Sequence, residues 1–388
     1  MQFKFSDGKE LRKHWMLEED MHFLNHGSFG AAPRVVLQAQ QRFRDRMERQ
    51  PVDFLVRQAP AELRAAAGDL AGFLGAQGED LAFVENATAG VNAVLRSYPW
   101  QAGDELLLSV HAYPAVKHLT RFVARQSGIV IREFDFAFPL KEGEILENFS
   151  AAVTSATRMA IIDHVSSPLA IVYPLQEMLA VCRAKGVRTL VDGAHAPGML
   201  ALDIPALQVD WYVGNCHKWL FAPKGCAFLW AAPGSRDFLQ PPVVSLRMED
   251  GFPATFDWVG TRDPSPWLSI SAAIAFYREM GGSEIPAYLH QNLLAASQLL
   301  QETWQVESPA AQQQLGTMAT LPLPLSGEAT LERANQIRDQ LWREHRIEVP
   351  LFAFDGRLWV RISAQLYNVI DDYVALAAAV KRLTSHRA

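Results

Sequence analysis

The chain has 388 residues, of which 49% are hydrophobic and 20% charged. This composition is typical of a folded globular protein with a large core and excludes a disordered or collagen-like chain. The formal net charge is −6 and no block of like charges runs along the chain, so nothing marks a surface for nucleic acid or anionic lipid, and we expect a small-molecule partner.

The N-terminal residues and the cysteines indicate the cellular compartment of the protein. Residues 1–15 mix charged with aromatic side chains, unlike a signal peptide, and no apolar run approaches the roughly 18 residues that span a membrane. Cys182, Cys216 and Cys226 form no CxxC pair, which is typical of a reducing compartment. Histidines and cysteines also lack zinc-ligand spacing. We therefore expect a cytoplasmic protein without a metal site or a membrane partner.

Helix-like and strand-like segments alternate between residues 60 and 230. In chain order, the apolar spacing predicts a helix over 61–74, a strand over 81–84, a helix over 88–96, a strand over 105–110, a helix over 115–125, strands over 129–134 and 158–163, a helix over 175–184, and strands over 187–191 and 211–213. Such alternation predicts an α/β fold with a mainly parallel central sheet sandwiched by helices. Sheets of this kind bind ligands beyond the carboxyl ends of their strands.

The pattern changes after residue 230. Residues 231–263 are rich in proline, glycine and aromatic side chains, and the spacing then predicts helices over 268–278 and 292–304, a strand over 358–362 and a helix over 369–383. We therefore expect a smaller α+β C-terminal domain. The predicted division is an N-terminal segment over 1–20, a large domain over 21–259 and a small domain over 260–388.

Polar residues follow two of the predicted strands at the edge where a ligand would bind: Asp192 and His195 after one, and Asn215, His217 and Lys218 after the other. Lys218 lies in the apolar context WYVGNCHKWLFAP, where a solvated surface charge is unusual. Burial lowers the pKa of a lysine and frees a nucleophilic amine that can form a Schiff base. The alternative is a lysine whose ammonium group reaches solvent at the edge of the core.

Asp192 precedes Lys218 by 26 positions, and each residue ends a predicted strand. This arrangement suits pyridoxal phosphate, whose aldehyde binds a lysine and whose pyridinium nitrogen faces a carboxylate. The phosphate needs a separate cradle, and the turn between strand 81–84 and helix 88–96, with Asn86, Ala87 and Thr88, would direct helical N–H groups at it. Alternatively, Asn86 or Thr88 is only a helix cap.

Five blocks of the sequence resemble, in the same order, those of the class V aminotransferase family of pyridoxal phosphate enzymes, which have fold type I. The blocks are LNHGSFGAAP at 24–33, FVENATAGVNAVLRS at 83–97, DHVSSPLAIVYPL at 163–175, VDGAHAPG at 191–198 and YVGNCHKWLFAPKG at 212–225. The resemblance covers about residues 21–383, makes 21–259 the cofactor-binding domain, and leans toward the isopenicillin N epimerase-like branch, which is related to cysteine desulfurases.

The resemblance implies specific roles at the cofactor. Lys218 would be the Schiff-base lysine and the acid/base at the α-carbon, and Tyr113, or else His111, would stack on the ring. The other implied contacts are Asp192 at the pyridine nitrogen, His195 near the phenolic oxygen, Ala87, Thr88, Asn215 and His217 at the phosphate, and Thr261 at the phosphate of the partner subunit. A homodimer with shared active sites follows from the same resemblance.

The resemblance also implies a substrate site. Arg361 would grip the substrate carboxylate, for which a planar guanidinium suits bidentate binding. The alternative for Arg361 is a strand-edge arginine paired with Asp371 or Asp372. The other implied substrate residues are Asn25, His26 and Ser167, with Arg57 entering from the partner chain.

We therefore expect a pyridoxal-phosphate-dependent enzyme that acts at the α-carbon of an amino acid or an amino-acid-containing metabolite. The first expectation is an isopenicillin N epimerase-like epimerase, and the alternatives are a C–S lyase or an aminotransferase. An epimerase needs a proton donor on each face, and the candidates for the second catalytic donor beside Lys218 are Tyr113, His111 and His26. No cysteine follows Cys226, which disfavours the persulfide chemistry of cysteine desulfurases. A non-catalytic scaffold with the same fold is the remote alternative, because a scaffold has no need of Lys218.

Overall fold

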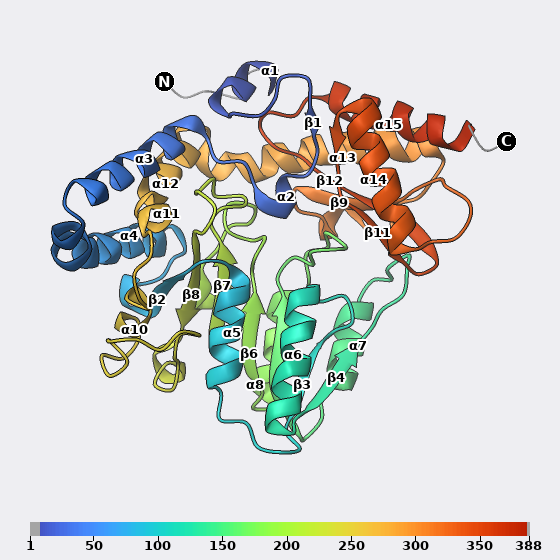
Figure 1. Cartoon of the computed structure of the whole chain (residues 1–388). Helices are drawn as coiled ribbons and strands as arrows, with labels where there is room; N and C mark the ends of the chain where they lie inside the picture. Colours follow the sequence, from blue (N-terminus) through green and yellow to red (C-terminus); the bar gives the residue numbers. More distant parts are fainter. Residues whose placement is uncertain (1–7, 386–388) are drawn as a thin grey trace.

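The structure, a computed structural model, describes residues 8–385 and has a seven-stranded sheet with helices on both faces and a smaller three-stranded sheet beside it (Figure 1). The order of the large sheet is β2 (Leu81–Val84), β8 (Ala227–Ala231), β7 (Trp211–Asn215), β6 (Arg188–Asp192), β5 (Thr157–Asp163), β3 (Glu105–Ser109) and β4 (Val130–Phe134). The strands from β7 to β4 are parallel, and β8 is antiparallel to both of its neighbours. The predicted α/β class is confirmed.

Burial on both faces explains why these strands are continuously apolar. Leu106 and Leu108 of β3 pack with α5 (Ala87–Ser97) and α6 (Pro114–Ser127), whereas Leu107 packs in the core on the other face. That second core includes α8 (Leu175–Ala184) and α4 (Ala59–Phe73). Parallel sheets covered in this way need apolar side chains on both faces.

The smaller sheet comes from the C-terminal part of the chain. Its order is β11 (Leu351–Phe354), β12 (Arg357–Ser363) and β9 (Met318–Pro322), all antiparallel. The helices packed around it are α13 (Ile285–Trp304), α14 (Leu331–His345) and α15 (Ile370–Ser385). Near the N-terminus, β1 (His22–Phe23) pairs in parallel with β10 (Ile347–Glu348). This pairing brings the LNHGSFG loop against the C-terminal part of the chain.

The other helices lie on the outside of the large sheet or connect its parts. They are α1 (Gly8–Leu11), α2 (His26–Phe29), α3 (Arg34–Arg49), α7 (Glu144–Ala152), α9 (Ile204–Leu207), α10 (Ala254–Asp257), α11 (Ser265–Leu268) and α12 (Ile270–Glu279). Across residues 8–385, each helix is too short or too polar to cross a bilayer.

Candidate active site

A cavity of about 450 Å³ opens at the carboxyl ends of β5, β6 and β7. The short helix α2 and the smaller sheet lie on the other side of this edge (Figure 1). The cavity brings together these residues predicted from the sequence: Ala87, Thr88, Tyr113, Ser167, Asp192, His195, Asn215, His217 and Lys218. Their positions follow from the topology, because parallel strands end at one edge of the sheet.

Lys218 is buried at this edge, just beyond the end of β7. The backbone N–H groups of Cys216 and His217 both donate to the carbonyl of Cys226, at 3.0 and 3.2 Å, which fixes the turn that carries the lysine. Burial and, to a smaller extent, the Arg361 charge lower the pKa of Lys218 and the Asp192 charge raises it, and the result is a pKa of about 7, down from 10.5. A large share of the lysine is therefore a neutral amine near pH 7.

His195 contacts the lysine amine directly. Its Nε2 lies 3.1 Å from Lys218 Nζ, and the indole N–H of Trp219 donates to its Nδ1 at 3.4 Å. Burial holds the pKa of His195 well below its usual range, so the ring is neutral. Because Nδ1 accepts, the proton is on Nε2 and is donated to the lone pair of the neutral lysine.

Asp192 ends β6 within the same cavity. One of its oxygens, Oδ1, accepts from the Ala194 N–H at 3.0 Å. Burial raises the pKa of Asp192, while the Ala194 hydrogen bond and the Lys218 charge lower it. The carboxyl group therefore has one firm donor, the Ala194 N–H, and is further stabilised as an anion whenever Lys218 is protonated.

The N-terminus of α5 forms an anion cradle. The Ala87 N–H donates to Asn215 Oδ1 at 2.8 Å, and the Ala89 N–H donates to the capping Asn86 side chain at 2.9 Å. Within residues 8–385, the backbone N–H and the hydroxyl of Thr88 have no hydrogen-bond partner. Asn86 is thus the cap, and the Thr88 donors are available to an anion at a helix N-terminus.

Arg361 extends from β12 toward this cavity. It donates to the carbonyl and hydroxyl of Ser167 and, at 3.1 Å, to the Ser28 hydroxyl. Burial lowers its pKa to about 10, so it is cationic at neutral pH. It forms no ion pair within the described part of the chain, and the two aspartates considered above pair elsewhere, Asp371 with Lys9 and Asp372 with His22. The guanidinium can therefore receive a carboxylate.

Two predicted substrate residues lie behind the cavity wall. His26 is fully buried, with Nδ1 2.7 Å from the Tyr367 hydroxyl and Nε2 2.9 Å from the Lys218 carbonyl. The Asn25 amide donates to Glu348 at 2.9 Å and accepts from the Ser28 hydroxyl. His26 holds the turn that carries Lys218, and Asn25 holds Ser28, a partner of Arg361; neither residue lines the cavity.

Three further predicted residues also lie away from the cavity wall. His111 pairs with Asp135 at 3.1 Å and packs on Phe136, whereas Tyr113 lines the cavity. Arg57 is exposed on the helical turn Asp53–Gln58 and pairs with Asp53, and Thr261 is also exposed. Both were expected at the site of a partner subunit.

Sequence reasoning missed two residues of the site, Ser28 and Asp163. Both line the cavity. Ser28 lies inside the LNHGSFG block, next to residues that were chosen, but nothing local shows that it meets Arg361. Asp163 ends a predicted strand, as Asp192 does, so the same signal could have found it.

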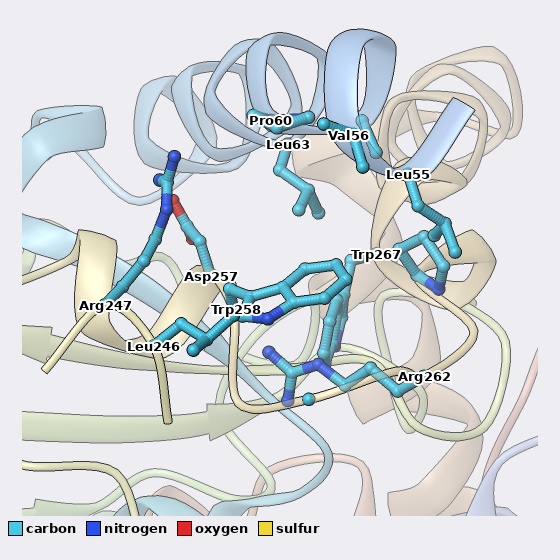
Figure 2. A pocket seen from close by; sticks show the side chains of 13 residues that line it. Leu55, Val56, Pro60, Leu63, Leu246, Arg247, Asp257, Trp258, Arg262 and Trp267 are labelled. Atoms are coloured by element: carbon cyan, nitrogen blue, oxygen red, sulfur yellow. The ribbon is translucent and has the colours of Figure 1, made fainter. Parts of the chain in front are cut away.

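A second, apolar cavity of about 240 Å³ lies beside the first. Figure 2 shows its lining side chains, with the Trp258 indole among Leu63, Leu246 and Trp267. Arg262 connects the two cavities, because it lies over the Trp267 ring at 4.1 Å and donates to Glu85, on the wall of the first cavity, at 2.7 Å.

Comparisons with known proteins agree with this geometry. Residues 23–330 match the aminotransferase class-V family. Isopenicillin N epimerase of Streptomyces clavuligerus is 34% identical, with 98% of this chain and 99% of that protein covered. L-cysteine desulfhydrase of Arabidopsis thaliana is 30% identical, with 93% and 87% covered. A solved structure of a variant of C-DES, with glycine covalently linked to its PLP cofactor, superposes with a TM-score of 0.83 at 24% identity and covers 95% of this chain and 98% of that one.

The donor set of the cavity fits pyridoxal phosphate. A buried neutral lysine amine suits an aldehyde, the buried Asp192 carboxyl suits a ring nitrogen, and the unpartnered Thr88 donors at the start of α5 suit a phosphate. The three groups line one cavity, so a single ligand can meet all of them.

Proposed function

The chain belongs to the aminotransferase class-V family, and from this premise we propose that it is a pyridoxal-phosphate-dependent epimerase acting at the α-carbon of an amino acid or an amino-acid-containing metabolite. The observation that carries the proposal is the Lys218 amine, with its lowered pKa, in one cavity with Asp192. The unpaired cation of Arg361 adjoins this cavity, because it donates to Ser28 and Ser167 on the cavity wall. When bound, the cofactor withdraws electrons from the α-carbon and makes its proton acidic.

The chain's own residues bind and orient the substrate. Arg361 binds the α-carboxylate through two parallel N–H donors, and Ser28 and Ser167 fix the plane of its guanidinium. Asp192 holds the positive charge at the ring nitrogen. Lys218 removes the α-proton, and His195 keeps the lysine amine oriented through its Nε2–H.

Epimerisation needs a second proton carrier, because the proton must return on the opposite face. We assign this role to Tyr113, which lines the cavity and whose side chain interacts electrostatically with Arg361. His111 and His26, the other groups considered for it, lie outside the cavity wall and are held by Asp135 and Tyr367. The two isopenicillin N epimerases among the relatives, 34% and 36% identical, support epimerisation as the outcome.

A C–S lyase is the second candidate, because relatives named L-cysteine desulfhydrases cover nearly the same residues. The lyase also begins with loss of the α-proton to Lys218 but needs no second proton carrier. It needs no catalytic cysteine either, and burial holds the pKa of the Cys226 thiol well above its usual range, which makes this cysteine a poor nucleophile.

One experiment separates these reactions. The holoenzyme is incubated in D₂O with isopenicillin N and with a panel of L-amino acids that includes cysteine and cystine. An epimerase exchanges the α-proton and converts one configuration to the other without releasing sulfide or ammonia. Release of sulfide with a keto acid would overturn the epimerase proposal in favour of the lyase, and consumption of an added keto acid would indicate transamination.

The lowered pKa of Lys218 predicts an unusual pH dependence. Only the neutral amine attacks an aldehyde, so the rate at which Lys218 of the apoprotein condenses with pyridoxal phosphate should rise with pH through about 7 and then level off. An ordinary lysine, with a pKa of about 10.4, would give a rate that still rises above pH 9. Stopped-flow absorbance at a series of pH values measures this, and a rate that climbs steadily to pH 10 contradicts the account.

We also propose that the protein is a homodimer and that a second copy covers the apolar face around the second cavity (Figure 2). Val56 is 62% exposed and Leu246 is 89% exposed on this face, where single chains seldom leave so much apolar surface open. The resemblance places Arg57 and Thr261, which lie near this face in sequence, at the site of the partner. Three free, buried cysteines support the proposed cytoplasmic location.

The dimer predicts that Leu246→Asp yields monomers with much lower turnover, because a buried unpaired carboxylate opposes association. Leu331→Asp is the matched control, since Leu331 is 67% exposed at the start of α14, far from this face in the sequence. Light scattering coupled to gel filtration measures the mass, alongside turnover. A dimer that survives Leu246→Asp, or equal effects of both substitutions, would place the interface elsewhere.

A further inference from the structure

The cavity contains a second buried carboxyl group beside Asp192. Asp163 and Asp192 end the neighbouring parallel strands β5 and β6 and are register partners. Both residues are buried and both line the cavity. Neighbouring strands lie about 4.8 Å apart, and register partners point to the same face. The His164 N–H also donates to the Asp192 carbonyl at 2.9 Å, which ties the two strand ends together.

The surroundings of the two carboxyl groups differ. The ionised form of Asp192 is stabilised by the hydrogen bond from the Ala194 N–H and by the Lys218 charge. Asp163 is faced by two acidic groups, Asp192 from β6 and Tyr173 from the segment before α8, and the Tyr173 hydroxyl donates to Ser109 instead. Over residues 8–385, no lysine, arginine or histidine side chain donates to Asp163.

The nearby titratable groups add no cation at Asp163. The adjacent His164 directs its Nδ1 at the Tyr212 hydroxyl, 2.8 Å away, and burial lowers its pKa to about 4, so its ring is neutral. Burial and the Asp192 charge hold the pKa of the Tyr212 hydroxyl well above its usual range, so Tyr212 is neutral. Burial and the Asp192 charge likewise hold the pKa of Asp163 well above its usual range.

We propose that Asp163 and Asp192 form a carboxyl pair in which Asp163 carries the proton and donates it in a hydrogen bond to Asp192. The pair then has a single negative charge, which is on Asp192. The inference rests on the proposed function, in which Asp192 faces the ring nitrogen of the cofactor. Two adjacent carboxylates shielded from water do not both ionise near neutral pH. Asp163 is a positioning residue, because it acts through Asp192.

This arrangement explains how Asp192 stays ionised although it is buried. Burial alone would raise its pKa, and a hydrogen bond from a neutral acid stabilises the anion and offsets that effect. Oδ1 of Asp192 accepts from Ala194, and within residues 8–385 Oδ2 accepts no other hydrogen bond. The Asp163 hydroxyl supplies one from the adjacent strand.

Two substitutions of Asp163 separate a neutral donor from an anion. Asp163→Asn keeps the shape, the neutrality and an N–H donor, so the acid limb of the pH profile of turnover should stay in place. Asp163→Val removes the donor, and the acid limb should move upward by about one pH unit or more, which is a tenfold or greater loss of ionised Asp192 at low pH. A downward move of the limb in Asp163→Asn would mean that Asp163 is an anion in the native protein, which overturns the proposal.

Infrared spectroscopy of the holoenzyme tests the proton without turnover. The wild-type protein should show the carbonyl band of a protonated carboxyl group at pH 7, and Asp163→Asn should lose it. Asp257→Asn is the matched control, because the Asp257 side chain is also largely shielded from solvent but forms an ion pair with Arg64. A band that survives Asp163→Asn, or that disappears only with Asp257→Asn, contradicts the carboxyl pair.

The pH dependence of unfolding gives an independent result. The pKa of Asp163 is raised on folding, so between the unfolded value of about 3.9 and the folded value the native state holds a proton that the unfolded chain releases. Wild-type stability should therefore fall relative to Asp163→Asn as pH rises above about 4. The melting-temperature difference should grow from pH 4 to pH 8, whereas a packing role gives a constant difference and overturns the proposal.

These measurements separate the carboxyl pair from the proposed function. The infrared and unfolding results need no substrate, so the pair can be confirmed even if no amino acid is epimerised. Conversely, the cofactor could attach to Lys218 while the protonated-carboxyl band stays the same in Asp163→Asn. That result would support the proposed function and contradict the carboxyl pair.

Discussion

Replacing Lys218 with alanine is expected to lower turnover by at least about 10³-fold, because one side chain both binds the cofactor aldehyde and moves the α-proton. Its amine is buried, neutral near pH 7 and 3.1 Å from His195 Nε2, an arrangement that no other lysine of the described chain shares. Turnover is measured as α-proton exchange in D₂O with saturating cofactor. Added primary amines of small size should restore part of the rate, which a misfolded variant would not show.

Lys224 provides the control for this substitution. The residue is exposed, its amine donates to the Gly30 carbonyl at 2.9 Å, and it does not line the cavity. Lys224→Ala should keep cofactor attachment and most of the turnover. If Lys218→Ala turns over at the wild-type rate, or if both substitutions have equal effects, Lys218 is not the reacting amine.

Replacing Arg361 with alanine should lower kcat/KM by about 10²- to 10³-fold for substrates with a free α-carboxylate. The reason is the loss of a buried bidentate pair worth about 3–4 kcal/mol, within the range for charge-assisted pairs shielded from solvent. Arg361→Lys should recover only part of this, since an ammonium group keeps the charge and loses the planar fork. Steady-state kinetics with each amino acid measure the effect.

The matched amide of the same amino acid controls for general damage at Arg361. An amide cannot form the ion pair, so it should be a poor substrate for the wild type and should lose little further in Arg361→Ala. The guanidinium is held by Ser28 and Ser167 from outside its own strand, so the substitution leaves those hydroxyls without their donor. Equal losses for the acid and the amide would show that Arg361 supports the fold and does not bind the carboxylate.

Continuous apolar runs made most of the large sheet predictable. The strands β3, β5, β6 and β7 are apolar on both faces, and each begins and ends within two residues of the predicted limits. β8 was not predicted, because its run AFLWA follows a short turn after Gly225 and has no helix before it. α3 was not predicted either, because ten of its 16 residues are polar or charged and its stability comes from packing against other helices.

The site residues that directly follow a buried strand were predictable from the sequence, and those whose role depends on partners far away in the sequence were not. Lys218 and Asp192 could be found because each follows a buried strand. His26 could not be placed correctly, because its partners are Tyr367 and the Lys218 carbonyl, 341 and 192 positions away. Ser28 meets Arg361 across 333 positions, and no local pattern encodes such a pair.

Reduction with borohydride shows whether Lys218 is the residue that binds pyridoxal phosphate. The holoenzyme is reduced, digested and mapped by mass spectrometry, with Lys218→Ala treated in parallel. We predict that the peptide containing Lys218 carries the reduced cofactor and that the variant carries none. A cofactor found on Lys224 or another lysine, or a protein that takes up no pyridoxal phosphate at all, would contradict the account.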